Sequence, residues 1–243
     1  TQTAGIVFAG VFLNSGGSPS SPDVKQTTAE TYDGSSWTEV ADLTTARQNT
    51  TGCGSTTAAL CFGGNTGSLV GVTEKWNGTS WTEVGDLTTA RKYLKGAGTN
   101  TAALCIGGQP NVAATETWNG TSWTEVGDLN TGRQNTTGCG TTTSALCFGG
   151  STGSDVTIAE SYNGTSWTEV GDLNTARRYL NGAGATATAA LCMGGHPARA
   201  ITESFNGTSW TEVGDLNSGR HSAATATQGT NTSTLITGGV LPG

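Results

Sequence analysis

Basic, histidine and tyrosine side chains are scarce in this chain, so its chemistry is expected where they gather. There are 11 lysines and arginines, two histidines and four tyrosines among 243 residues. Tyrosine beside amide and cationic side chains is typical of sites that recognise sugars or other polar surfaces. The candidate ligand-binding residues are Gln48, Lys92, Tyr93, Gln134, Arg178, Tyr179, His196, Arg199 and His221.

The acidic residues do not form a catalytic pattern. Fifteen of the 18 fall into three columns that recur along the chain and begin at Glu30, Glu39 and Asp42. Catalytic carboxylates must converge in one pocket, so we interpret these columns as structural acceptors for arginines or turn amides. Two separate histidines do not supply a metal site, and no Ser-His-Asp arrangement or phosphate loop is present. We expect no enzymatic activity, no metal and no cofactor.

The composition also excludes several classes of protein. A net charge of −7 disfavours nucleic acid as a partner, because phosphate binding needs a basic face. No apolar run approaches the roughly 20 residues that a membrane helix needs, so we expect no membrane insertion. The chain begins at Thr1 without a signal-like segment, which favours a processed product or an excised fragment.

A repeated unit organises the whole chain. The string W-T-E-V-x-D-L occurs five times, an aromatic residue precedes each of its tryptophans by five positions, and an arginine follows each by ten. The tryptophans are Trp37, Trp81, Trp123, Trp167 and Trp210. Gly-Gly pairs recur with the same period. Such regularity argues against the disorder that 38 glycines and 12% charged residues would otherwise suggest.

Each unit is predicted to contain four short strands. In the second unit these are 49–54, 58–62, 72–76 and 81–84. An Asn-Gly-Thr-Ser sequence joins the last two strands, and Asn-Gly predicts a hairpin whose type I′ turn has two residues at positive φ. A unit of about 43 residues with four strands is typical of a propeller blade.

The order of these features resembles the kelch repeat: arginine, a strand ending in Gly-Gly, Glu-x-aromatic, then tryptophan. The resemblance covers essentially the whole chain and implies an all-β, kelch-type β-propeller whose first strand is innermost in each blade. The repeats are more alike than kelch repeats usually are, as in repetitive phage and marine metagenomic proteins or in a consensus design.

Strand counting favours five blades in one domain covering residues 1–243. The sequence predicts 21 strands, whereas five blades need 20 and six need 24, so we expect a closing blade built from both termini. One strand is then left over, and the long connection after Gly10 points to the N-terminal strand. A six-bladed or truncated ring is the alternative. The repeat units are approximately 1–46, 47–90, 91–132, 133–176 and 177–219, with a closing segment 220–243.

The candidate site residues lie in two segments that differ between units. One follows each arginine and alternates between Gln-Asn-Thr-Thr and a basic form such as 92–95, which also contains Lys95. The other follows each Gly-Gly pair. In a propeller both segments lie on the same face, so we expect one variable face that carries the bases, tyrosines and histidines. The alternative is that these are solvated loops whose sequences differ without function.

Six cysteines occupy positions that are otherwise apolar or small. We interpret them mainly as small buried hydrophobic residues. The pairs Cys53/Cys61 and Cys139/Cys147 are the candidates for disulfides across a hairpin.

Three function classes were compared. The favoured one is a non-enzymatic binding module that recognises a glycan or surface receptor through the variable face, as in a phage tail fibre, a virion surface or another extracellular adhesin. The second is a structural or assembly subunit that associates with itself through the unpaired terminal strand, or a consensus propeller without a ligand. The third, an enzyme, lacks the necessary residues.

Overall fold

The structure, a computed structural model, describes residues 4–12, 24–225, 230, 232, 234 and 236–241. Every regular element in this part of the chain is a β-strand, and there are 21 of them, as the sequence predicts. Within it, no helix has the length and hydropathy to cross a membrane.

The strands have the following bounds in chain order. They are β1 (Gly5–Phe12), β2 (Val24–Tyr32), β3 (Trp37–Val40), β4 (Thr51–Ser55), β5 (Ala58–Phe62), β6 (Thr73–Trp76), β7 (Trp81–Glu83), β8 (Lys95–Gly98), β9 (Ala103–Ile106), β10 (Thr115–Trp118), β11 (Trp123–Glu125), β12 (Thr137–Thr141), β13 (Ser144–Phe148), β14 (Ala159–Tyr162), β15 (Trp167–Glu169), β16 (Asn181–Thr186), β17 (Ala189–Met193), β18 (Thr202–Phe205), β19 (Trp210–Val213), β20 (Ala224–Thr225) and β21 (Ile236–Thr237).

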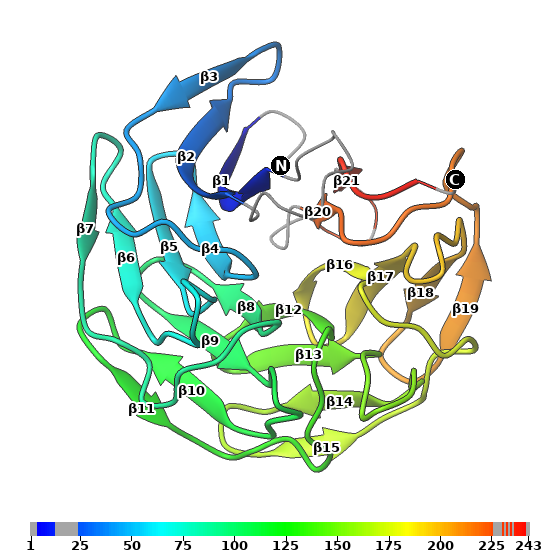
Figure 1. Cartoon of the computed structure of the whole chain (residues 1–243). Helices are drawn as coiled ribbons and strands as arrows, with labels where there is room; N and C mark the ends of the chain where they lie inside the picture. Colours follow the sequence, from blue (N-terminus) through cyan, green and yellow to red (C-terminus); the bar gives the residue numbers. More distant parts are fainter. Residues whose placement is uncertain are drawn as a thin grey trace.

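These strands form the repeated antiparallel sheets of a propeller-like fold. Four sheets have four strands each, β4–β7, β8–β11, β12–β15 and β16–β19, and in each the strands pair in chain order. Figure 1 shows the sheets arranged around a centre, with β4, β8, β12 and β16 innermost and β7, β11, β15 and β19 on the perimeter. The predicted all-β architecture and strand order are confirmed.

The hydrophobic core lies between neighbouring sheets. One cluster joins Leu60 and Phe62 of β5 to Cys105 of β9 and to Trp118 and Trp123 of the following sheet. The ring of Trp123 packs 4.7 Å from that of Phe62, centroid to centroid, and the equivalent contact recurs at Phe8–Trp81 and Phe148–Trp210. The aromatic columns therefore fill the space between blades, because the innermost strands are rich in glycine and alanine.

The hairpins between the outer strands form as predicted, but their turn type differs. Trp76 pairs with Trp81, so the loop has four residues rather than two. Gly78 has a positive φ of 94°, whereas Asn77 does not have a positive φ. The side-chain oxygen of Asn77 instead accepts hydrogen bonds from the amides of Thr79 and Ser80, both at 2.9 Å. The asparagine thus acts through an Asx turn, and the type I′ prediction is wrong.

The disulfides considered from the sequence are not formed. All six cysteines are free and buried. Cys53 pairs with Leu60 and Cys61 pairs with Gly52, so the two cysteines are one register position apart and point to opposite faces of the sheet. Cys139 and Cys147 have the same offset. Burial raises the pKa of the Cys53, Cys105, Cys139 and Cys192 thiols to about 12, which makes them unreactive.

The N-terminal strand is not the surplus strand that the sequence suggested. β1 pairs with β2 in the register that β5 uses with β6, so that Val7 lies opposite Glu30 as Cys61 lies opposite Glu74. The amide of Gly10 also donates to the carbonyl of Arg47, a contact that recurs between complete sheets. β1 therefore holds the second-strand place of its sheet, and much of the long connection after it lies outside the described residues.

The predicted closing blade shared by both termini is not formed among the described residues. β1, β2 and β3 make a three-stranded sheet, while β20 pairs with β21 in a separate two-stranded sheet. β20 does lie next to β16, since the hydroxyl of Thr225 in β20 donates to the carbonyl of Gly182 in β16 at 3.1 Å. Among the residues that the structure describes, the first sheet thus has no innermost strand and the last has no outer pair of strands.

Candidate binding site

The two variable segments lie side by side, as the sequence predicted. Isolated antiparallel bridges join the segment after the arginine to the segment after the Gly-Gly pair in four units. These bridges are Gln48–Asn65, Lys92–Gln109, Gln134–Ser151 and His221–Val240. The candidate residues therefore gather at one end of the ring.

A chain of backbone hydrogen bonds holds this end together. The second residue after each arginine has a left-handed backbone, with φ between 52° and 57°; these residues are Asn49, Tyr93, Asn135, Tyr179 and Ser222. Each amide from the second onward donates to the carbonyl of the equivalent residue in the preceding unit, at 3.0–3.2 Å. We call these five residues the mouth. Asparagine adopts this conformation readily, but tyrosine rarely does.

Four aromatic side chains cluster at the mouth. The ring centroids of Tyr93 and Tyr179 are 6.2 Å apart, and the ring of Tyr179 lies 6.0 Å from His221 and 6.4 Å from His196. The two histidine rings are 5.5 Å apart. Residues far apart in sequence thus form one continuous aromatic surface.

Cations border this aromatic cluster. The Lys92 ammonium lies 5.0 Å from the centre of the Tyr93 ring, and the Arg178 guanidinium lies 5.6 Å from the centre of the Tyr179 ring. Burial, together with the nearby His196 and Arg178, lowers the pKa of His221. The lowered pKa favours the uncharged form of the His221 ring beside these cations.

Asp155 belongs to this surface, although the sequence reasoning did not select it. Its carboxylate forms an ion pair with Arg178 at 3.1 Å, and both side chains are partly exposed. A signal was available, because Asp155 is one of the three acids outside the repeated columns. It neutralises one of the cations at the rim of the cluster.

Three predicted residues stand apart from the cluster. In the described part of the chain, no ring contact or ion pair joins Gln48, Gln134 or Arg199 to it. Gln48 and Gln134 exchange backbone hydrogen bonds with the neighbouring loop, and Arg199 does so with Gly195 and Arg220. Their backbones help to position the loops, whereas Lys92, Tyr93, Arg178, Tyr179, His196 and His221 come together.

A cavity of about 240 Å³ opens among the mouth residues. Its lining includes Tyr93, Tyr179, Asn135 and Ser222, and Lys95 at the start of β8. A second cavity of about 700 Å³ lies between β1, β4 and β20, and Lys95 lines that one too. The sequence places Lys95 on the variable face but selects neither Lys95 nor Asn135 as a site residue, because comparison of the repeats does not predict the cavity.

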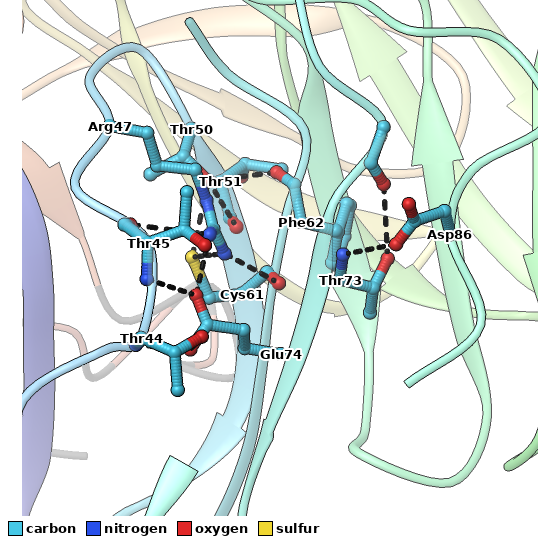
Figure 2. A network of polar contacts seen from close by, with 11 residues as sticks. Thr44, Thr45, Arg47, Thr50, Thr51, Cys61, Phe62, Thr73, Glu74 and Asp86 are labelled. Atoms are coloured by element: carbon cyan, nitrogen blue, oxygen red, sulfur yellow. Dashed lines mark hydrogen bonds and ion pairs between the residues drawn. The ribbon is translucent and has the colours of Figure 1, made fainter. Parts of the chain in front are cut away.

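Buried ion pairs anchor the mouth from below. In four units the arginine that precedes the variable segment pairs with the glutamate of the third strand, with all side chains at most 1% exposed. The pairs are Arg47–Glu74 (2.6 Å), Arg91–Glu116 (3.0 Å), Arg133–Glu160 (2.7 Å) and Arg177–Glu203 (2.6 Å). Figure 2 shows the first of them, in which Glu74 also accepts from the amide and hydroxyl of Thr44. The structural interpretation of this acidic column is confirmed at these four positions.

The aspartate column is structural as well. Asp86 accepts from the amide of Thr73 at the start of β6 at 3.0 Å, as Figure 2 also shows, and the equivalent bond recurs at Asp128, Asp172 and Asp215. Among the described residues, no group of three or more histidine, cysteine or acidic side chains is placed to hold a metal ion. The arrangement at the mouth therefore offers stacking surfaces, hydrogen bonds and a few cations.

Comparison with known proteins adds no relative to this description: the chain matches no family model and no curated protein.

Proposed function

We propose that this chain is a kelch-type propeller that acts as a non-enzymatic binding module, recognising a glycan or a surface receptor through the mouth. The observation that carries the proposal is the cluster of Tyr93, Tyr179, His196 and His221, bordered by Lys92 and Arg178. An extracellular or virion-surface setting, such as a tail fibre, would suit such a module.

The chemistry of the cluster supports this class of ligand. Tyrosine offers a large, rigid face and a hydroxyl at low entropic cost, a combination that recurs in recognition surfaces. The strained backbone at Tyr93 and Tyr179 is held by hydrogen bonds between units, so both rings are positioned before a ligand arrives. Structural needs alone do not require tyrosine here, because asparagine fills the same position at Asn49 and Asn135.

The repeats provide the variant that tests this proposal. Tyr93→Asn with Tyr179→Asn introduces the residue that two other units already hold in the same backbone conformation, so the fold should persist. We expect the wild-type chain to bind members of a glycan array or a cell surface, and the double variant to lose at least about tenfold in affinity. Tyr162→Phe, at a buried aromatic position, is the matched control. Equal binding by all three proteins would show that the tyrosines of the mouth do not contribute to ligand binding.

A second candidate function, self-assembly, is favoured by the unfinished ends of the ring. Trp37 is 41% exposed, whereas the equivalent Trp81, Trp123, Trp167 and Trp210 are 4–5% exposed. Trp123 donates to the hydroxyl of Thr73 in the preceding sheet, at 2.9 Å. Thr202 is the equivalent residue in the last complete sheet, and its buried hydroxyl has no partner. Trp37 and Thr202 are thus complementary groups on opposite ends.

The two ends also carry side chains of opposite charge. Arg220 and Glu30 occupy the positions of the buried ion pairs, but neither takes part in an ion pair between described residues. Glu30 is exposed, and Arg220 donates only to backbone carbonyls. A second copy of the chain could therefore join its Arg220 end to the Glu30 end of the first, a head-to-tail contact.

A charge swap tests this second candidate. We expect the wild-type mass in solution to rise with concentration, Glu30→Arg to remain monomeric, and Glu30→Arg with Arg220→Glu to recover the association. If the protein is monomeric at every concentration, yet the double swap still restores stability that the single change loses, the two ends pair within one chain. That result would exclude assembly.

A further inference from the structure

Lys95 is placed unlike any other cation in the chain. It is the first residue of β8, an innermost strand, and it lines both the 240 Å³ cavity at the mouth and the 700 Å³ cavity beside it. Burial lowers the pKa of its ammonium to about 8. The side chain of Lys95 is half-buried, so its ammonium has lost part of the hydration that a ligand could replace.

No carboxylate compensates this ammonium. The five ion pairs of the described residues all use arginine, and none includes Lys95. Lys95 is also the one charged residue among the described residues that line the two cavities. The lining therefore contains a positive charge and nothing to repel an anion.

Other polar groups without partners occupy the same level of the ring. Lys95 pairs with Ile106, and the residues in the equivalent register position of the neighbouring innermost strands are Thr51, Thr137 and Asn181. The hydroxyl of Thr137 and the side-chain nitrogen of Asn181 are buried and have no hydrogen-bond partner. Neither of these two side chains lines the cavities, whereas Thr51 lines both of them together with Lys95. An ammonium and a hydroxyl can therefore donate to an anionic guest there.

We propose that the mouth cavity binds the carboxylate of an acidic saccharide, with Lys95 as its counter-ion. The carboxylate would accept hydrogen bonds from the Lys95 ammonium inside the cavity, while the sugar ring rests against Tyr93 and Tyr179 at its entrance. This inference rests on the proposed binding function and narrows its ligand class to saccharides that carry an acid.

Glucuronate and glucose are the matched probes, because they share a ring and differ in the carboxylate. Titration calorimetry at pH 6.5 is expected to show glucuronate binding at least about tenfold tighter than glucose. Binding is expected to weaken as the pH rises through about 8, because the ammonium loses its proton there. The affinity for glucose is expected to stay constant over the same range.

The repeats again supply the variants. Lys95→Thr installs the residue found at Thr51 and Thr137, and it is expected to abolish both the preference for glucuronate and its dependence on pH. Lys75→Thr is the control, since it removes a lysine from β6 and installs the residue of the equivalent Thr117. The pH profile of the wild-type protein decides the question even if Lys95→Thr fails to fold.

Each contrary outcome overturns a different claim. Equal binding of glucuronate and glucose, unchanged by Lys95→Thr, overturns the role of Lys95 and leaves glycan recognition at the mouth intact. Binding of inorganic phosphate but not glucuronate overturns the carboxylate and favours a phosphorylated ligand. If neither sugar binds, the acidic-saccharide inference fails, while the glycan array with the tyrosine variants tests the proposed function separately.

Discussion

At the residue scale, the buried arginine–glutamate ion pairs are the main charged interactions in the interior of the fold. Each pair joins the connection before an innermost strand to the third strand of the same sheet, and backbone amides complete the coordination of the glutamate. Removing one partner leaves the other charge buried without compensation. We therefore expect each of the four buried pairs to contribute to stability, which gives a physical reason for the arginine and glutamate columns to recur.

Glu160→Gln is expected to lower the free energy of unfolding by about 3–5 kcal/mol, because it leaves the Arg133 guanidinium buried without its ion-pair partner. Denaturant titration measures the change. Glu169→Gln is the control: Glu169 lies opposite Glu160 in the β14–β15 ladder but is exposed, and its change is expected to stay within about 0.5 kcal/mol. Similar losses in both variants would contradict a special role for the buried pair.

At the element scale, the repeat predicts strands well and their surroundings less well. The second strand of the second unit falls at residues 58–62 in both prediction and structure, because an apolar run bounded by glycines leaves little freedom. The turn after Trp76 differs, since the asparagine side chain can satisfy two amides and so removes the need for a second positive φ. The cysteine pairs differ because register, which composition does not encode, sets their faces.

Glycines of the innermost strands set how closely two sheets approach. A Cβ on Gly182 would lie 2.8 Å from the Phe148 ring and 2.9 Å from the Thr137 hydroxyl. Gly182→Ala is therefore expected to cost about 1–3 kcal/mol of unfolding free energy through overpacking. Gly214→Ala, where nothing lies within 4 Å, is expected to be nearly neutral. Equal thermal stability of the two variants would show that the sheets can separate without penalty.

At the scale of the whole molecule, the sequence predicts the architecture but not how the ring ends. Unit length, strand order and the shared face of the variable segments all follow from comparing repeats. β1 and β20 belong to incomplete units at the two ends, and a pattern taken from complete units does not specify how such ends pair. The candidate site shows the same division. The tyrosines, histidines and flanking cations are predicted from their differences between units. That Lys95 lines a cavity is seen only once the innermost strands are arranged in space.

The central claim is that the variable mouth, and not the outer surface of the blades, is where a ligand binds. Hydrogen exchange of the chain, with and without the best-binding glycan of an array, tests it directly. The account predicts slower exchange in residues 92–95 and 178–181, with no change in the hairpin loops 77–80 and 119–122. Protection confined to those hairpin loops, or no glycan binding at all, would contradict it.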